Sequence, residues 1–518
     1  MRRRDFLKNL GMVAGGPILL NGLGLSVLGR SSLFGFLGEE SDRVLVLVQL
    51  NGGNDGLNTI IPLNQYDPLA NARPSIIIPP NQIIPVTDTV GFHPSLTGLK
   101  SLYDDGRLGI VHSVGYPDQN RSHFRSIEIW SSGSPADEIW NTGWAGRFLD
   151  QQYPGYPLDY PTPMDPDPFA ISMGFQVSET CQGSAANFAI AINNPFSPAN
   201  LWEWGGNEYA GTLYGYEYEY VQGAIAMTNK YTERIAAAAN SGANAATYPD
   251  TGLAEQLKNV ALLISGGLKT RVYTVSLGGF DTHAGQAFFE NPGVGTHADL
   301  LKTLSDAIKA FEDDLKAQGL DHRVLGMTFS EFGRQIKENG SLGTDHGTAA
   351  PMILFGACTE GKILGDNPVI PANVGAQEGV SMQFDFRDVY GTVLTDWLGV
   401  DEESVQTMLY PEFQHLPMLG CGNPISSLQD LGEGEIDLSH FPNPFSHTAT
   451  IRFSGTGEWL RLSIFDALGH EIKVLAEGRY GRGPQEFTFN ASSLPAGNYY
   501  CRLQLGRRQK TMLMVKVG

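Results

Sequence analysis

The chain has 518 residues, 42% hydrophobic and 10% aromatic, which is enough for a substantial core and argues against bulk disorder. Its 55 acidic residues outnumber 35 basic ones, and the net charge of -20 argues against binding of a nucleic-acid backbone. The four cysteines are far apart and form no CxxC pair, so they predict neither a zinc–thiolate site nor a disulfide scaffold. The spacing is compatible with one or two long-range disulfide bridges.

Residues 1–30 begin with basic side chains and continue as a glycine-rich, mildly apolar segment. The letters RRDFLK at residues 3–8 resemble the twin-arginine export signal. A signal anchor is the alternative, but Asn21 and the glycines make the segment weakly hydrophobic for a membrane span. The resemblance implies a chain that the twin-arginine machinery exports in the folded state, without a transmembrane span in the mature protein.

The first polar motif of the body follows a predicted buried strand over residues 43–50. This strand runs into the loop NGGNDGLN, which offers the carboxylate of Asp55 between amides on a flexible turn. Such a loop suits a hard or borderline cation. A glycine and asparagine turn without chemistry is an equal alternative.

A second strand is predicted over residues 107–114, and the loop after it leads into a helix that reaches Trp130. Ser122 lies at the start of this helix, where oriented N–H groups favour negative charge, so it is a candidate nucleophile. A serine that only caps the helix is the alternative. Arg121 and His123 beside it are candidates for gripping an anionic oxygen and for proton transfer.

Residues 151–250 are rich in Tyr, Pro, Asn and Gly, and we interpret them as an insertion or cap beside the sheet, with helices over residues 221–239 and 253–265. A further strand over residues 271–277 delivers Asp281 and His283. In an extended segment, residues i and i+2 point the same way, so this pair could hold one ion together.

The helix predicted over residues 299–318 is followed by an apolar strand over residues 324–329, which stops just before Glu331. A loop then leads to Asp345 and His346, which lie between glycines. The alternative for Glu331 is a residue that caps a helix, and the alternative for Asp345 and His346 is a polar turn. Because ligands collect outside the carboxyl ends of the strands of open α/β sheets, we expect all these side chains at one rim.

The order of these motifs resembles the alkaline phosphatase and sulfatase superfamily. The motifs LNGGNDGLN, NRSHF, GGFDTH, TFSEFGR and GTDHGTA together resemble the exported family called domain of unknown function 1501, over roughly residues 43 to 400. The resemblance implies an α/β, alkaline-phosphatase-like fold over residues 43–420, with a mainly parallel sheet flanked by helices. It also implies one or two divalent ions: zinc, magnesium, manganese or calcium. The ligands it implies are Asp55, Asp281, His283, Glu331, Asp345 and His346.

By the same resemblance, Ser122 would be the nucleophile, and Arg121, Arg334 or Asp345 would support it. This chain has Glu331-Phe332 where the superfamily commonly has Asp-His, so one imidazole is missing. The formylglycine motif of sulfatases is absent, which favours a phosphoesterase. We therefore expect an exported metal-dependent hydrolase of small anionic esters. The alternative is a non-catalytic, metal-containing binding protein of the cell surface or envelope.

The composition changes at residues 421–436, which read as a linker, and residues 437–518 show the short alternating strands of a small all-β sandwich. The letters PNPF, IFDALGHEI and LPAGNYYCRL resemble the type IX secretion sorting domain of Bacteroidetes-type bacteria. An adhesive or carbohydrate-binding sandwich is the alternative. The resemblance implies that the type IX machinery carries the chain from the periplasm to the cell surface or beyond.

Overall fold

The computed structural model describes Leu19–Leu20 (β1), Leu23–Gly24 (β2), residues 42–198, residues 212–421, and residues 438–517 apart from 444, 456–458, 466–470, 482, 493 and 506–507. The chain divides into two compact units, Asp42–Gln429 and a unit that contains Asp430–Gly518. The arginine pair of the predicted export signal and nearly all of the predicted linker lie outside the described residues.

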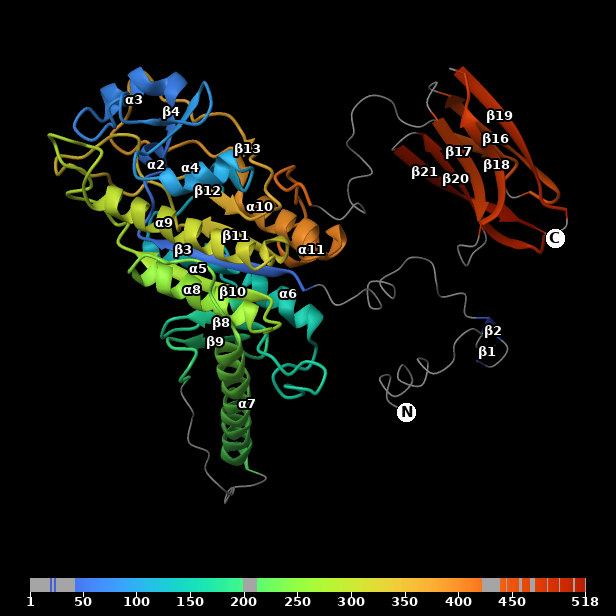
Figure 1. Ribbon diagram of the computed structural model, residues 1–518, viewed down its shortest axis with the longest axis horizontal. Helices are drawn as coiled ribbons and strands as arrows, with labels where there is room; N and C mark the ends of the chain where they lie inside the picture. Colours follow the sequence, from blue (N-terminus) through green and yellow to red (C-terminus); the bar gives the residue numbers. More distant parts are fainter. Residues whose placement is uncertain are drawn as a thin grey trace. The chain divides into compact units, whose positions relative to one another are not determined.

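The first unit is built on a nine-stranded sheet with the order β13-β7-β12-β11-β3-β10-β8-β9, with β14 also paired to β7 (Figure 1). Among the described strands of this sheet, β12 alone runs against its neighbours. The fold class predicted from the sequence, a mainly parallel α/β sheet, is confirmed. The strands are β3 (Val44–Asn51), β7 (Leu108–Gly115), β8 (Ala170–Met173), β9 (Ala189–Ile192), β10 (Val272–Gly278), β11 (Val324–Phe329), β12 (Ala350–Phe355), β13 (Ile363–Leu364) and β14 (Phe384–Asp385).

Helices cover both faces of this sheet, which explains why the central strand β3 is apolar on both sides. Val44, Val46 and Val48 pack on the face covered by α4 (Thr97–Asp104), α7 (Leu213–Ser241), α8 (Gly252–Ser265) and α9 (Thr296–Ala317). Leu45 and Leu47 pack on the opposite face, under α5 (His123–Ser132), α6 (Trp144–Gln152), α10 (Phe386–Thr392) and α11 (Glu402–Met408).

Smaller elements complete the unit. A three-stranded sheet with the order β4-β6-β5 lies outside the main sheet. No helix among the described residues is long and apolar enough to cross a membrane. The remaining elements are α2 (Gly56–Thr59), β4 (Ile60–Pro62), η1 (Leu63–Gln65), α3 (Tyr66–Ala72), β5 (Ile84–Pro85), β6 (Val90–Phe92), η2 (Glu179–Cys181), η3 (Asp321–Arg323) and the π-helical turn η4 (Val393–Trp397).

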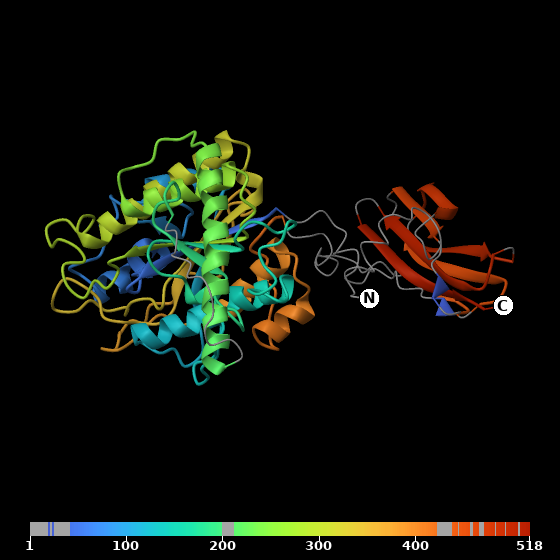
Figure 2. The ribbon, with the colours of Figure 1, turned by 90° about the horizontal axis from the view of Figure 1, so that it is seen from below.

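Residues 151–250 differ from the insertion that the sequence predicts. They contribute β8 and β9, which extend the main sheet at one edge, because the short apolar runs at residues 170–173 and 189–192 pair in parallel beside β10. They also contain α7, a helix of 29 residues that Figure 2 shows end to end across the unit. Strong Pro and Gly content around these two strands hides them from a reading of composition alone.

The second unit contains two antiparallel sheets, β15-β16-β19 and β18-β17-β20-β21, whose apolar residues share one core. This confirms the predicted β-rich tail. Three of its strands, β15, β18 and β21, are not predicted from the sequence, and two of these, β18 and β21, carry charged side chains among their apolar ones. The strands are β15 (Leu438–Phe441), β16 (Thr448–Gly455), β17 (Trp459–Phe465), β18 (Glu471–Arg479), β19 (Gly483–Asn490), β20 (Gly497–Leu505) and β21 (Arg508–Lys516).

One long-range disulfide closes the first unit. Cys358, just after β12, is bonded to Cys421, at a sequence separation of 63. The other two cysteines, Cys181 and Cys501, are free and buried. The disulfide anchors the segment that follows α11 to the sheet, and disulfides persist in the oxidising compartments outside the cytosol.

Replacing both members of the pair (Cys358→Ala with Cys421→Ala) should lower the free energy of unfolding by about 2–4 kcal/mol, because the bond removes the closure entropy of a long loop from the unfolded chain. Denaturant titration with and without dithiothreitol measures this difference. The double variant should be insensitive to the reductant. Equal stability of the oxidised wild type and the variant would contradict a stabilising role.

Candidate metal centre

Loops from five strands meet at one rim of the main sheet. β3, β10 and β11 end there and deliver Gly52, Asp281 and Glu331. His123 begins α5 beyond the end of β7. Because β12 runs in the opposite direction, its beginning lies at this rim, and His346 comes just before it.

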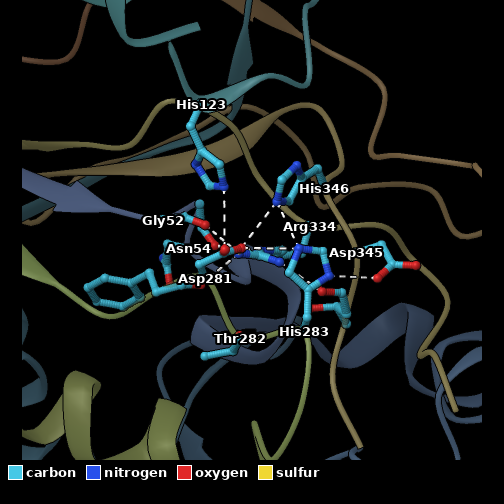
Figure 3. Close-up of polar contacts among 12 residues, drawn as sticks. Gly52, Asn54, His123, Asp281, Thr282, His283, Arg334, Asp345 and His346 are labelled. Atoms are coloured by element: carbon cyan, nitrogen blue, oxygen red, sulfur yellow. Dashed lines mark hydrogen bonds and ion pairs between the residues drawn. The ribbon is translucent and has the colours of Figure 1, made fainter. Parts of the chain in front are cut away.

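Three imidazoles point at the carboxylate of Asp281 (Figure 3). The Nε2 atom of His123 lies 3.5 Å from Asp281 Oδ2, and those of His283 and His346 lie 3.2 and 3.1 Å from Oδ1. Ligand atoms of His123, Asp281 and His346 all lie within 4.8 Å of one another, and His283 Nε2 is 2.9 Å from His346 Nε2. The four residues therefore offer one convergent set of nitrogen and oxygen donors.

Each ring is oriented by an acceptor at its other nitrogen. Nδ1 of His123 lies 2.8 Å from Glu331 Oε1, and Nδ1 of His283 lies 2.8 Å from Asp345 Oδ1. Nδ1 of His346 lies 2.9 Å from the carbonyl oxygen of Arg121. An ionised carboxylate or a carbonyl only accepts, so in the neutral rings Nδ1 carries the proton and Nε2 presents a lone pair. This pairing is the usual support of metal-binding histidines.

The arrangement at the Nε2 atoms fits a cation. Two lone pairs 2.9 Å apart, on His283 and His346, repel each other unless a positive charge lies between them. His123 Nε2 is buried and has no hydrogen-bond partner within the described part of the chain. A set of three imidazoles and one carboxylate suits zinc or another first-row transition metal, whereas calcium and magnesium prefer oxygen ligands.

Asp281 stays ionised at the centre of this set. Burial acts to raise the pKa of its carboxyl, but the hydrogen bond and positive charge of Arg334, together with the imidazoles of His346 and His283 beside it, lower that pKa to about 2. Its side chain is 48% exposed, so the centre is open to a ligand from solvent. Burial lowers the pKa of the His346 ring and outweighs the opposing effects of Asp281 and the Arg121 carbonyl, which favours the neutral imidazole.

Arg334 lies beneath the centre and ties its loops together. Its guanidinium donates to Asp281 Oδ1 at 2.7 Å and to the carbonyl oxygens of Gly53, Phe280 and Thr344 at 2.8–2.9 Å, with a further bond to Gly52. The side chain is fully buried. The resemblance predicts that Arg334 assists the nucleophile, but this buried position suits the orientation of Asp281 and not contact with a substrate.

Gly52 allows the closest approach between two of these loops. Its φ is +120°, and a Cβ atom there would lie 2.2 Å from the backbone nitrogen of Asp281. Its own N–H donates to Glu331 Oε1 at 2.8 Å. The same Glu331 oxygen therefore fixes both the β3 loop and the ring of His123. The structure thus places Glu331, which the sequence predicts as a metal ligand, against Nδ1 of His123 and not among the atoms that converge at Asp281.

Phe332 follows Glu331 in the loop after β11. Its ring is buried, and its centroid lies 4.9 Å from that of His123 and 4.5 Å from that of His346. It therefore packs against two of the three imidazoles and restricts their movement.

Asp55 lies outside the atoms that converge at Asp281. Its two carboxylate oxygens are 2.7 and 3.0 Å from Arg73 Nη1, and Gln286 Nε2 donates to Oδ2 at 2.6 Å. Burial acts to raise the pKa of Asp55, but Arg73 and its neighbours lower it. Asp55 and the equally buried Arg73 form an ion pair within the loops, and no local pattern in the sequence marks Arg73 as the partner.

Ser122 and Arg121 lie beside His123. Ser122 is the N-cap residue of α5, as the helix start predicts, and its side chain is exposed. Its Oγ makes no hydrogen bond with any residue that the structure describes. Arg121 Nη1 donates to the carbonyl oxygen of Gln377 at 2.9 Å. His297, near the start of α9, is buried, and its Nε2 atom lies 3.0 Å from Asn54 Oδ1.

Comparison with known families agrees with the motifs. Residues 218–413 match the family described as protein of unknown function DUF1501. Residues 439–516 match the secretion system C-terminal sorting domain. Both resemblances drawn from the sequence are therefore confirmed, and the tail indicates secretion by the type IX machinery to the cell surface or outside. No curated protein matches the chain.

Solved structures with similar folds are distant. One is a protein in the alkaline phosphatase superfamily from Vibrio parahaemolyticus, 9% identical, covering 86% of this chain and 81% of that chain with a TM-score of 0.31. Another is a phosphonate monoester hydrolase from Silicibacter pomeroyi, which is 10% identical. The match covers 91% of this chain and 89% of that chain, with a TM-score of 0.31. The chain matches only 12% of PorZ, a type IX surface component of Porphyromonas gingivalis, over 16% of its own length, at 14% identity and a TM-score of 0.12. At these TM-scores the likeness carries no argument about chemistry.

Removing the carboxylate of Asp345, which pairs with Nδ1 of His283, tests whether the residues that orient the imidazoles matter for metal binding. Asp345→Ala should weaken the binding of zinc by about 10- to 100-fold, because the ring loses the acceptor that orients it. Isothermal titration of metal-free protein measures the affinity. Asp313→Ala, which removes an exposed carboxylate paired with Lys309 on α9, is the matched control and should bind like wild type. Equal affinity in both variants would refute the role of Asp345.

Proposed function

We propose that the chain is an exported, metal-dependent hydrolase of anionic esters, with phosphoric esters favoured over sulfuric ones. The observation that best supports the metal is the convergence of three Nε2 atoms on the ionised carboxylate of Asp281. The sorting-domain match supports export. The absent formylglycine motif favours phosphoric esters.

The ion would be held by Nε2 of His123, His283 and His346 and by the carboxylate of Asp281. A divalent ion supplies Lewis acidity, which stabilises negative charge on an ester oxygen and lowers the pKa of a nearby hydroxyl. Arg334 would keep Asp281 oriented, and Glu331 and Asp345 would keep two rings in the required tautomer. The single convergent set supports one ion per chain.

Ser122 is the nucleophile that we propose. It immediately precedes His123, so the serine and a ligand share one loop, and it lies where the free N–H groups of α5 favour an anion. Its hydroxyl has no base bonded to it among the described residues, so its activation would depend on the cation. Ser122 Oγ would lose its proton to solvent and bond to the phosphorus as the bond from phosphorus to the alcohol oxygen of the substrate breaks, and the alcohol would leave after taking up a proton. Water would then cleave the ester on Ser122, which restores the hydroxyl and releases phosphate.

Arg121 is the group that we propose to bind the anionic part of the substrate. One Nη atom is fixed by the carbonyl of Gln377, and its backbone carbonyl fixes the ring of His346. A guanidinium held next to the centre in this way could donate to an oxygen of a phosphoryl group.

A non-catalytic, metal-containing binding protein of the cell surface or envelope is the second candidate. The observation that favours it is the hydroxyl of Ser122, which is exposed and without a hydrogen-bonded base. The same observation fits an enzyme in which the hydroxyl is bonded only once substrate is present, so turnover decides between the two.

Activity with an aryl phosphate tests the proposal. The zinc- or manganese-loaded wild type should hydrolyse p-nitrophenyl phosphate, and Ser122→Ala should lower kcat by roughly 100-fold or more while metal content stays unchanged. Ser101→Ala, at an exposed position in α4, is the control and should remain active. Full activity of Ser122→Ala would refute the nucleophile. Bound metal without turnover of any phosphate, phosphodiester or sulfate ester would favour the binding protein.

A further inference from the structure

A cleft of about 560 Å³ lies outside the metal centre, between the loop after β7, the loop after α5 and the segment after α11. Its lining includes two aromatic rings, Trp140 and Tyr410, and three prolines, one of which is Pro117. The helices α10 and α11, which lie side by side in Figure 1, contribute Arg387 and the pair Gln406 and Thr407 to the wall. The chemistry proposed above gives this cleft no role.

Both rings are fixed in place before any ligand arrives. The guanidinium carbon of Arg147 lies 4.8 Å from the centroid of Trp140, and that of Arg387 lies 4.2 Å from the centroid of Tyr410. Trp140 Nε1 donates to Glu138 at 2.8 Å, and the hydroxyl of Tyr410 donates to Asp388. A ligand that packs on these rings therefore loses little free energy to ordering them.

The charges around the cleft favour a neutral ligand. Arg387 is neutralised by Asp385, which accepts from its Nε and Nη2 at 2.9 and 2.7 Å. Glu138 and Glu412 add negative charge to the lining and disfavour an anion. The two arginines already packed on the rings repel a second cation at the same faces.

Hydrogen-bonding groups in the lining remain available. Within the described residues, the amide of Gln406 and the carboxylate of Glu412 have no hydrogen-bond partner. A sugar ring has apolar C–H faces that pack on aromatic rings and a rim of hydroxyls that bind amides and carboxylates. We infer that this cleft binds neutral sugar units, as part of an oligosaccharide.

The cleft is joined to the helix that carries His123. Arg125, two residues further along α5, donates to the carbonyl oxygens of Ala136 at 3.1 Å and of Glu138, so the Trp140 loop is tied to the first turns of α5. Pro117 belongs to the same loop as Ser122. A sugar chain in the cleft would thus contact the loop that carries Ser122, and its use as part of a substrate rests on the proposed function.

Binding of uncharged sugars to the full chain tests the inference. We expect at least one member of a panel of short gluco-, galacto-, manno- and xylo-oligosaccharides to bind in isothermal titration. Trp140→Ala should raise its Kd by roughly tenfold or more, and Gln406→Ala should also weaken binding. Arg147 keeps its bonds to the carbonyls of Ser132, Thr142 and Met408, so loss of Trp140 should leave the fold intact.

Two controls separate this site from the rest of the molecule. Phe175→Ala removes an exposed aromatic ring outside the cleft and should bind like wild type. His346→Ala should lose metal but keep sugar binding, so failure of the proposed chemistry and failure of the cleft are distinguishable. Binding of no sugar in the panel, or unchanged binding by Trp140→Ala, would overturn the inference. Binding of spermidine that is lost in Trp140→Ala would instead identify a site for cations.

Discussion

The ion pair between Arg334 and Asp281 is the interaction on which the rim of the sheet depends. A buried guanidinium is costly to remove from water, and here it is compensated by one carboxylate and by carbonyl oxygens from the loops after β3, β10 and β11. Because one side chain satisfies all three loops, none of them can shift without leaving a buried charge or carbonyl unpaired. Asp281 is thereby fixed where three imidazoles can reach it.

A metal centre at this rim also requires that each imidazole carries its proton on the nitrogen that faces away from Asp281. A histidine offers a metal its lone pair only when the proton sits on the other nitrogen, and that choice is made by Glu331, Asp345 and the carbonyl of Arg121. Phe332 adds an apolar wall that packs on two of the rings. The centre therefore combines a layer of donors with a supporting layer drawn from the same few motifs.

The sequence predicts much of this arrangement because strand ends are easy to recognise. The apolar runs that became β3, β7, β10 and β11 stop at the polar motifs, and parallel strands bring those stops to one edge. Asp281 and His283, two residues apart, do meet. Glu331 and Asp345, which the sequence also predicts for the site, lie at the same rim.

The role of Glu331, the partner of Asp55 and the strands β8 and β9 could not be predicted, because they depend on distances between elements that are far apart in the sequence. Whether Glu331 contacts an ion or orients His123 is decided by how far α5 lies from β11, which no local pattern encodes. The pairing of Asp55 with Arg73 is equally invisible, since it depends on how the segment before β5 folds over the rim. In the same way, β8 and β9 are too short and too closely surrounded by prolines to be recognised before their partner β10 is in place.

Metal content of the purified full chain tests the central claim most directly. Elemental analysis after loading with zinc and dialysis should find one ion per chain in the wild type and in His322→Ala, where an exposed histidine outside the centre is removed. His346→Ala should retain none. Metal-free wild type, or full retention by His346→Ala, would contradict a centre built from three imidazoles around Asp281.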